Sequence, residues 1–343
     1  MTRVLVAMSG GVDSSAAAAL LAEAGHDVTG ATLKLWGGES DSGCCSVGDV
    51  EDARRVAAQL DIPHYVFNLT DDFDAAVVAP YAAAYGAGRT PNPCVECNRH
   101  IKFDRLLRRA DAMGFDALAT GHHARVRRTL DGSSRLARGV DRAKDQSYVL
   151  YMLGQRELVR ILLPVGEITK VEVRAHAARL GLRTAAKPES MDVCFIGRGE
   201  RRQFLAERVA AAAGPVVDTG GRVLGRHDGV TAFTVGQRRG VGVATGERRY
   251  VIDVDAPSAT VTIGGRADLL RPSVEVDGLS FVAGESPEPG ARVVAQVRAH
   301  GEPLGVRLDG RVVTFDLPQP RVAPGQVVAL YDGDNLLGGG LAA

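Results

Sequence analysis

Residues 9–15, SGGVDSS, combine two glycines, three hydroxyls and one carboxylate between an apolar run at residues 4–8 and an alanine-rich stretch. A turn of this composition between a strand and a helix leaves backbone N–H groups pointing outward, and glycine lets an anion approach the backbone closely. The N-terminus of the following helix also favours negative charge. The segment therefore predicts a phosphate-binding loop, although it matches neither the Walker A pattern nor the G-x-G-x-x-G pattern.

Asp13 is the one carboxylate of this loop, and a carboxylate beside phosphates has two common uses. It can bind a Mg²⁺ ion that accompanies the phosphates, or it can accept backbone N–H groups as a helix cap. A plain glycine turn capped by Asp13 is therefore the alternative to a phosphate-binding loop. The apolar run before the segment and the helical stretch after it favour the phosphate-binding loop.

Two of the five cysteines lie close together. Cys94 and Cys97 belong to the segment GRTPNPCVECNRHIKFDRLL, whose prolines and asparagines predict a rigid loop that leads into a helix. A thiol near a helix N-terminus has a lowered pKa and is a stronger nucleophile. Cys194 lies much further along the chain, in the segment KPESMDVCFIG.

Three interpretations of these thiols are open. A buried structural role suits any single cysteine, and it is the expectation for Cys44 and Cys45. A structural zinc site needs four ligands, and no second pair of cysteines lies near Cys94 and Cys97. A sulfur relay needs one thiol that carries a persulfide and another that resolves it as a disulfide, and Cys97 with Cys194 fit this best.

The chain has 343 residues, of which 45% are hydrophobic, so it can form roughly two or three domains with cores. No apolar stretch reaches the ~20 residues of a membrane span and no signal-peptide pattern is present, so a cytoplasmic protein is expected. The odd number of cysteines favours reduced thiols.

Residues 1–100 carry a net charge of −7, residues 101–215 carry +9 and the remainder carries −2. The middle segment predicts a polyanion-binding face, with solvated arginine-rich helices as the alternative.

Apolar runs alternate with helical stretches over the first part of the chain, which predicts an α/β fold with a doubly wound parallel sheet covered on both faces. The predicted strands are 4–8, 28–35, 64–69 and 115–119, and the predicted helices are 15–24, 46–60, 101–113 and 169–180. After about residue 200, short strand-like runs separated by glycine-containing turns predict an all-β region. These runs are 250–254, 260–263, 292–297, 312–315 and 327–331, with residues 271–272 as the join between two β modules.

Seven stretches, in one order along nearly the whole chain, resemble the bacterial tRNA-specific 2-thiouridylases. They are MSGGVDSS, GRTPNPCVECNRHIKF, ATGHHAR, KDQSYVLYML, PESMDVCFIG, TVGQRRGVGV and PGQVVALYDGDNLLGGG. The first also resembles the PP-loop of the ATP pyrophosphatases, which split ATP between the α and β phosphates to adenylate a substrate. The resemblance implies a PP-loop catalytic domain at residues 1–198, a small central β-rich, tRNA-contacting domain at 199–270 and a C-terminal β-barrel at 271–343.

The resemblance also implies roles for individual residues. Cys97 corresponds to the catalytic nucleophile and Cys194 to the cysteine that carries the persulfide. The implied contacts to the target base are Asn92, Pro93 and Cys94, and some relatives carry aspartate in place of Cys94. The implied ATP-binding residues are Ala7, Met8, Ser9, Gly10, Gly11, Val12, Asp13, Ser14, Leu33 and Gly121. The implied tRNA-binding residues are His122, Lys144, Asp145, Gln146, Arg298, Ala299 and Gln326.

The reaction that this resemblance implies is ATP-dependent sulfuration of the wobble uridine of tRNA, position 34, to 2-thiouridine. The C2 carbonyl is adenylated, sulfur comes from an enzyme persulfide, and AMP and pyrophosphate are released. The expected cofactors are ATP and Mg²⁺. The expected partners are tRNAs for lysine, glutamate and glutamine, and a cysteine desulfurase or sulfur-relay protein as sulfur donor.

Alternatives to this reaction remain open at the level of sequence. Cys94, Cys97 and Cys194 would supply three thiolates, so an iron–sulfur cluster on them is an alternative cofactor. A PP-loop synthetase that makes a small amide and a non-catalytic RNA-binding module are the rival functions. Neither rival needs Cys97 together with Cys194.

Overall fold

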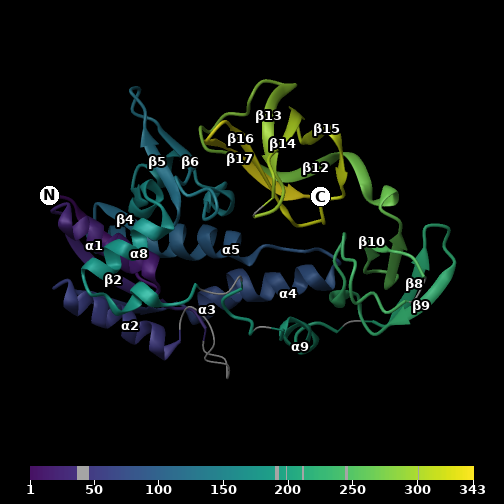
Figure 1. Ribbon diagram of the computed structural model, residues 1–343, viewed down its shortest axis with the longest axis horizontal. Helices are drawn as coiled ribbons and strands as arrows, with labels where there is room; N and C mark the ends of the chain where they lie inside the picture. Colours follow the sequence, from purple (N-terminus) through teal and green to yellow (C-terminus); the bar gives the residue numbers. More distant parts are fainter. Residues whose placement is uncertain (37–45, 190–192, 198, 211, 244–245, 300) are drawn as a thin grey trace.

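The computed structural model describes residues 1–36, 46–189, 193–197, 199–210, 212–243, 246–299 and 301–343. Three sheets organise these residues: one of five strands, one of four and one of eight. Figure 1 shows the five-stranded sheet and its helices at one end and the four-stranded sheet at the other, with the barrel above α4 (Ala79–Gly86) between them. No helix within these ranges is long and apolar enough to cross a membrane.

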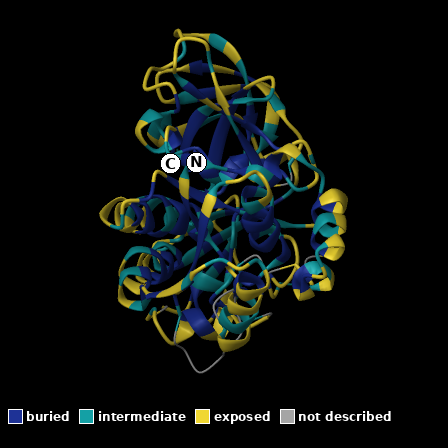
Figure 2. Ribbon diagram, turned by 90° about the vertical axis from the view of Figure 1, so that its left-hand side faces the viewer, coloured by how far each residue is buried: buried dark blue, intermediate teal, exposed yellow. Residues whose placement is uncertain are grey.

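The five-stranded sheet is parallel and has the order β3-β2-β1-β4-β7. Its side chains alternate between two cores, as the two-residue period of a strand requires. On β1, Val4 and Val6 pack with α1, α2 and α8, whereas Leu5 faces the opposite core with α4 and α6. Helices therefore cover both faces, which confirms the predicted doubly wound α/β architecture, and Figure 2 shows buried residues in the interior and exposed residues on the outer helices. The strands are β1 (Arg3–Ala7), β2 (Asp27–Lys34), β3 (His64–Asn68), β4 (Ala117–Thr120) and β7 (Ile161–Leu162); the helices are α1 (Val12–Glu23), α2 (Val47–Gln59), α3 (Thr70–Phe73), α6 (Leu107–Ala112), α7 (Gln155–Leu158), α8 (Lys170–Arg179) and α9 (Arg201–Ala206).

The loop that leads to the first two thiols ends earlier than predicted. Pro93 begins the helix α5 (Pro93–Glu96), and Asn92 caps it by accepting the Cys94 N–H at 3.1 Å. Proline suits the first helical position because its missing N–H needs no partner there. The helical run continues as the π-helix η2 (Cys97–Leu106) and then α6, so Cys97 lies within the run rather than on a loop. The expectation that this helix begins at residue 101 is wrong for this reason.

The four-stranded sheet has the order β10-β11-β8-β9. Strands β10 and β11 confirm the predicted runs at 250–254 and 260–263, while the β8–β9 hairpin was not predicted. The hydrophobic core of this region joins side chains of the sheet to one from a neighbouring loop. It includes Val216, Val251 and Val261 from the strands and Phe233 from the loop. The strands are β8 (Gly214–Asp218), β9 (Val223–His227), β10 (Tyr250–Asp255) and β11 (Thr260–Gly264).

Six antiparallel strands close into a barrel because β12 pairs with both β15 and β17. This confirms the predicted C-terminal barrel. Closure brings backbones together at Gly338, where a Cβ atom would lie 2.0 Å from the carbonyl oxygen of Ser280. Only glycine fits there, because any side chain would clash with the neighbouring strand. The strands are β12 (Leu270–Phe281), β13 (Ala291–Gln296), β14 (Leu304–Asp309), β15 (Val312–Pro320), β16 (Val327–Asp332) and β17 (Asn335–Ala342).

A hairpin from the earlier part of the chain extends the barrel sheet. Strand β5 (Ala124–Arg128) pairs with β6 (Ser134–Arg138), and β6 pairs with β17 through Leu136 and Leu336. Sequence analysis predicted no strand here, because arginines interrupt the apolar pattern and the partner strand lies far along the chain. Because β6 pairs with β17, the hairpin and the barrel form one continuous sheet. The domain boundaries at residues 198 and 270 stay predictions.

A buried polar network fastens this junction. Arg138, on β6, donates to Asp145 at 2.9 Å and to Gln296 at 2.5 Å, and its guanidinium lies 3.6 Å from the centre of the Tyr331 ring. The Ser147 hydroxyl lies 3.0 Å from both the Asp145 carboxylate and the Tyr331 hydroxyl. All five side chains are buried. Since a buried charge is stable only when it is paired and hydrogen-bonded, Arg138 and Asp145 depend on each other.

Replacing Arg138 with methionine should destabilise the protein, because it leaves Asp145 charged, buried and without its cation. We expect the free energy of unfolding to fall by about 3–5 kcal/mol, measured by urea denaturation. Arg135→Met is the matched control, because Arg135 lies on the same strand but is exposed. Equal unfolding midpoints for the two variants would contradict this role of the network.

Candidate active site

The predicted phosphate loop connects β1 to α1 at the carboxyl edge of the five-stranded sheet. Gly11 is the N-cap of α1, and no side chain hydrogen-bonds there as a cap. Ser14 donates to the Gly11 carbonyl oxygen and accepts the Ser9 N–H, both at 3.1 Å, which fixes the turn. The alternative that Asp13 caps this helix is wrong, and the uncapped N-terminus suits a phosphate. Within the predicted ATP-binding segment, the buried residues are Met8, Gly10, Val12 and Ser14, the partly exposed residues are Ala7, Gly11 and Asp13, and Ser9 is exposed.

Backbone segments crowd the start of α1. A Cβ atom on Gly121 would lie 2.6 Å from the Ser14 nitrogen, and one on Gly10 would lie 2.3 Å from the carbonyl oxygen of Asp49. Gly121 follows β4, and the strand order reverses between β1 and β4, which is where open α/β sheets bind ligands. Leu33 is buried on the adjacent strand β2. The residues predicted to bind ATP therefore meet at the ends of neighbouring strands.

Asp13 faces a lysine and a histidine that sequence analysis did not single out. Lys170, the first residue of α8, donates to its two carboxylate oxygens at 2.6 and 2.7 Å, and His123 Nε2 lies 3.1 Å from Oδ1. Burial alone would raise the pKa of Asp13, but the hydrogen bonds from His123 and Lys170 lower it below its usual value. The carboxylate is therefore charged at neutral pH. Lys170 already supplies a positive charge beside this carboxylate, and the binding of Mg²⁺ by Asp13 stays a prediction.

The predicted thiols lie at different depths. Cys97 is 7% exposed, whereas Cys94 and Cys194 are partly exposed. Cys97 belongs to a hydrophobic core that the first domain shares with the barrel, and Cys194 packs against the same core. Within the described ranges, no group of three or more His, Cys, Asp or Glu side chains is arranged to hold a metal ion. The three thiols therefore do not fit an iron–sulfur site in this structure, and Cys44 and Cys45 lie outside the described residues.

The triplet Lys144, Asp145 and Gln146, predicted to contact tRNA, is mostly engaged within the protein. The Asp145 carboxylate is buried in the Arg138 network, and the Gln146 side chain accepts the N–H of His123 at 2.9 Å. Gln146 is nevertheless exposed, whereas Lys144 is partly exposed and pairs with Glu189 at 2.8 Å. Each member of the triplet therefore has a partner within the protein, and Lys144 shares its charge with Glu189.

His122, the next residue predicted to contact tRNA, is buried. Its Nδ1 lies 2.7 Å from the Thr120 hydroxyl, and its ring packs 5.8 Å from that of Phe103. Burial lowers the pKa of the His122 imidazole well below its usual value, so the ring is neutral at pH 7. The side chain therefore supplies no positive charge for a phosphate.

The barrel residues predicted to contact tRNA border the first domain. Arg298 and Ala299 are exposed on the loop after β13, where their carbonyl oxygens accept from Gln296 at 3.0 and 2.8 Å. Gln326 instead donates to the carbonyl oxygen of Thr90 at 2.7 Å. The barrel therefore braces the loop that leads into α5, on which the predicted contacts to the target base lie.

Three family models match consecutive parts of the chain. They are the tRNA methyl transferase HUP domain over residues 2–198, the tRNA methyl transferase PRC-barrel domain over residues 202–265 and the Aminomethyltransferase beta-barrel domain over residues 272–342. The tRNA-specific 2-thiouridylase MnmA of Roseiflexus sp. is 48% identical over an alignment of 371 residues that covers 100% of both chains. That of Chloroflexus aurantiacus is 49% identical over 354 residues, covering 100% of this chain and 99% of the relative. The chain belongs to the tRNA-specific 2-thiouridylase family.

Two solved structures are partly similar to this 2-thiouridylase family member. A U34-tRNA thiolase from Methanococcus maripaludis is 20% identical with a TM-score of 0.38, covering 60% of this chain and 64% of that chain. A 4-thiouridine synthetase in complex with RNA and ATP is 19% identical with a TM-score of 0.38, covering 61% and 46%. Both overlaps are partial, and the family assignment rests on the full-length relatives and the family models.

Replacing Asp13 with asparagine should lower AMP formation from ATP about 100-fold, because Lys170 and His123 lose the charge that holds them beside the phosphate loop. Chromatography of the nucleotides measures this loss, and filter binding should show unchanged affinity for tRNA. Glu23→Gln is the matched control, since Glu23 lies at the far end of the same helix and pairs with Arg179 at 2.7 Å. If both variants lost activity equally, Asp13 would have only a structural role.

Proposed function

We propose that this protein converts the wobble uridine of tRNA, position 34, to 2-thiouridine in an ATP-dependent sulfur transfer. The printed names of its full-length relatives support this proposal. The observation that carries it is the combination of a phosphate loop at the switch point of the sheet with Cys97 and Cys194 at one shared core. A synthetase that forms a simple amide has no use for two such thiols.

Activation of the base comes first in this proposal. The carbonyl oxygen at C2 of uridine is a poor leaving group, so it attacks the α phosphate of ATP and pyrophosphate leaves. The N–H groups at the start of α1 hold the departing pyrophosphate, because a helix N-terminus favours anions. The wobble base must leave its stack to reach this site, as in other enzymes that modify a base.

Sulfur transfer follows. Cys194 carries sulfur as a persulfide, whose outer sulfur attacks C2 while AMP leaves with the former carbonyl oxygen. The Cys97 thiolate then attacks the inner sulfur of Cys194, so that the persulfide bond breaks and the outer sulfur stays on the base. In the alternative order, Cys97 first releases the sulfur as sulfide, which attacks C2. Both orders leave a disulfide between Cys97 and Cys194, which a thiol reductant must reopen.

The partners follow from this chemistry. A persulfide on Cys194 requires a donor that already carries sulfur in that form, as a cysteine desulfurase or a sulfur-relay protein does. The tRNAs for lysine, glutamate and glutamine are the expected substrates, and the cytoplasm is the expected compartment. We expect Mg²⁺ to arrive on the ATP phosphates, because both oxygens of Asp13 accept from Lys170.

Cys97→Ser and Cys194→Ser should each abolish 2-thiouridine formation and leave tRNA binding intact, whereas Cys94→Asp should keep much of the activity. After one turnover without reductant, peptide mass spectrometry should find Cys97 linked to Cys194. A dominant link between Cys94 and Cys194 would exchange the roles of the first two thiols.

Two other outcomes of the same experiment would overturn the relay. Full activity of Cys194→Ser with a persulfide donor would remove it. Equal loss in Cys94→Asp and Cys97→Ser, together with loss of a visible absorbance shoulder from anaerobically purified protein, would favour an iron–sulfur cluster.

The charge available to the tRNA backbone is smaller in the middle segment than its net charge suggests. Arg105, Arg108 and Arg125 each pair with an aspartate of the protein. A pair of opposite charges attracts a phosphate less than an unpaired cation does. Other basic residues must therefore contribute to tRNA binding.

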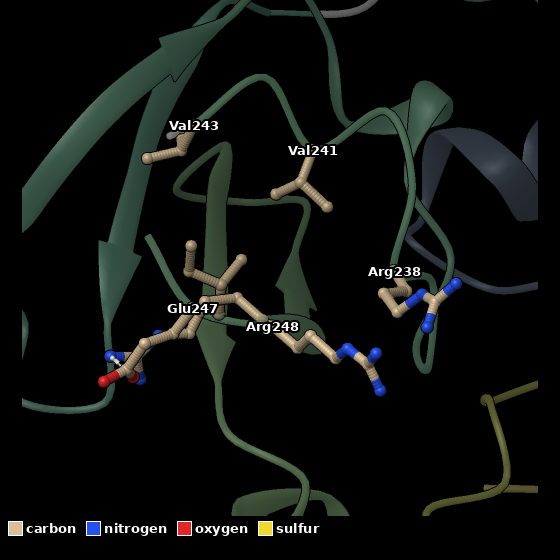
Figure 3. Close-up of a pocket in the computed structure, with 7 residues that line it drawn as sticks. Arg238, Val241, Val243, Glu247 and Arg248 are labelled. Carbon is tan, nitrogen blue, oxygen red and sulfur yellow. Dashed lines mark hydrogen bonds and ion pairs between the residues drawn. The ribbon is translucent and has the colours of Figure 1, made fainter. Parts of the chain in front are cut away.

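The central domain has a cavity lined partly by arginines, called the basic hollow below, which is a candidate for binding the tRNA backbone. A cavity of about 300 Å³ has an apolar wall that includes Val241 and Ile263, and arginines stand at its rim (Figure 3). The exposed side chains of Arg238 and Arg248 extend to the same side, whereas Arg249 pairs with Glu247 at 3.1 Å. Two neighbouring guanidinium groups suit a sugar–phosphate backbone, because each can bind a phosphate through two N–H groups. The lining residues are Arg238, Val241, Val243, Glu247, Arg248, Arg249 and Ile263.

The double substitution Arg238→Gln, Arg248→Gln should weaken tRNA binding and make the slope of log K against log[salt] shallower by roughly 1–2, through lost phosphate contacts. Filter binding at several salt concentrations measures this slope. Arg222→Gln is the matched control, because its side chain is 79% exposed in the same domain but does not line the hollow. An unchanged slope in the double variant would show that tRNA does not reach the hollow.

A further inference from the structure

Two arginines of the β5–β6 hairpin face each other across its strands. Arg127 lies directly opposite Arg135 in the antiparallel register, and both side chains are exposed. Residues in this position have Cβ atoms about 4.5–5.5 Å apart, and like charges at such a spacing are destabilising. Within the part of the chain that the structure describes, the hairpin arginines in salt bridges are Arg125 and Arg138. The repulsion between the opposed pair is therefore not offset by a direct ion pair there.

The opposed arginines share one face of the hairpin, because side chains of a strand alternate between its two faces. Val126 and Leu136, the next pair in the register, belong to the hydrophobic core that the first domain shares with the barrel. Arg127 and Arg135 therefore point away from this core, and Figure 1 shows the turn of the hairpin standing clear of the neighbouring elements. Packing of the hairpin does not explain why arginine stands at both positions.

Further positive charge lies on the same face. Arg125, two residues before Arg127 on β5, lies 3.0 Å from the Asp334 carboxylate, and Arg142 pairs with the same carboxylate. One negative charge therefore serves two guanidinium groups. We call Arg125, Arg127, Arg135 and Arg142, together with Asp334, the arginine face. Four positive charges against one negative charge leave it with a net charge of +3.

The one carboxylate of the hairpin itself has a different role. Asp131, in the turn, accepts from the Thr129 hydroxyl at 2.5 Å and from the Ser133 N–H at 2.9 Å. These hydrogen bonds lower the pKa of Asp131 to about 2, and the charge of Arg135 contributes least to this shift. Asp131 therefore holds the turn, and the arginine face keeps its excess of positive charge.

The arginine face begins beside the candidate active site. His123, whose Nε2 lies 3.1 Å from the Asp13 carboxylate, directly precedes β5. Because a strand advances by at most roughly 3.4 Å per residue, the backbone of Arg127 lies no more than roughly 14 Å from that of His123. The face therefore starts within the length of a few nucleotides from the phosphate loop.

We propose that the arginine face binds the sugar–phosphate backbone of the RNA arm whose base enters the active site, which is the anticodon arm of tRNA. A guanidinium binds a phosphate through two N–H groups, and a phosphate between Arg127 and Arg135 replaces their repulsion with attraction. RNA is favoured over an acidic protein, because the face starts beside the site that must hold the RNA base. The proposal rests on the proposed function for the identity of this arm.

The test measures binding of the full-length protein to a tRNA for lysine and to its isolated anticodon stem–loop, by filter binding at several salt concentrations. Arg127→Gln and Arg135→Gln should each make the slope of log K against log[salt] shallower by about 1 with both RNAs. Arg128→Gln is the matched control, because Arg128 is exposed on the opposite face, where it donates to the Ser134 hydroxyl at 3.1 Å. It should leave the slope unchanged.

Unfolding in urea without RNA separates a binding role from a structural one. Arg127→Gln and Arg135→Gln each remove one member of a repulsive pair, so each should unfold at a higher urea concentration than the unmodified protein. A lower unfolding midpoint together with weaker RNA binding would overturn the proposal, because the arginines would then support the fold.

Three further outcomes are decisive. Unchanged salt slopes with both RNAs would overturn the proposal, and slower sulfur transfer from the donor protein in the same variants would then assign the face to an acidic protein. A slope that changes with the whole tRNA but not with the stem–loop would overturn the placement on the anticodon arm. Binding needs neither ATP nor sulfur transfer, so absence of thiolation in the unmodified protein would count against the proposed function alone.

Discussion

Close contact between backbones at the start of α1 is the constraint on which the site depends. A side chain fits neither between Gly10 and α2 nor between Gly121 and α1. Glycine at these positions lets the ends of β1 and β4 and the first turn of α2 meet without side chains between them. The N–H groups of α1 then remain open to an anion, and the Lys170 and Lys187 ammonium groups donate to Asp13 and to the Gly10 carbonyl oxygen in this small region.

The barrel, on which three tRNA contacts are predicted, is also part of the scaffold of the site. Gln326 and the Pro324 carbonyl oxygen hold Thr90, at the start of the loop that leads to the first two thiols. The Arg138 network binds the same barrel to Asp145 of the first domain. The barrel that carries the predicted tRNA contacts and the segments that carry the predicted catalytic thiols therefore share their supports.

Sequence patterns predicted the elements whose signals are local. Alternating apolar runs predicted the doubly wound sheet, the helical stretch at residues 46–60 predicted α2, and short runs with turns predicted the barrel. The pairing of Asp13 with Lys170 and that of β6 with β17 could not be predicted, because each joins segments far apart in sequence. The helix start at Pro93 was missed because the prolines and asparagines around it are typical of a loop. Only the structure shows that the Asn92 side chain caps the helix by accepting the Cys94 N–H. The catalytic roles of the thiols stay predictions.

The pairing of Leu136 with Leu336 also sets an order of events during synthesis. A ribosome that adds about 5–20 residues per second completes β6 on the order of 10–40 s before it completes β17. During that interval β6 is an open edge, and open edges pair with the wrong strands or with other chains. Charged side chains discourage such pairing, and β5 and β6 carry Arg125, Arg127, Arg128, Arg135 and Arg138. The arginines that obscured the hairpin in the sequence thus protect the nascent chain until its partner strand arrives.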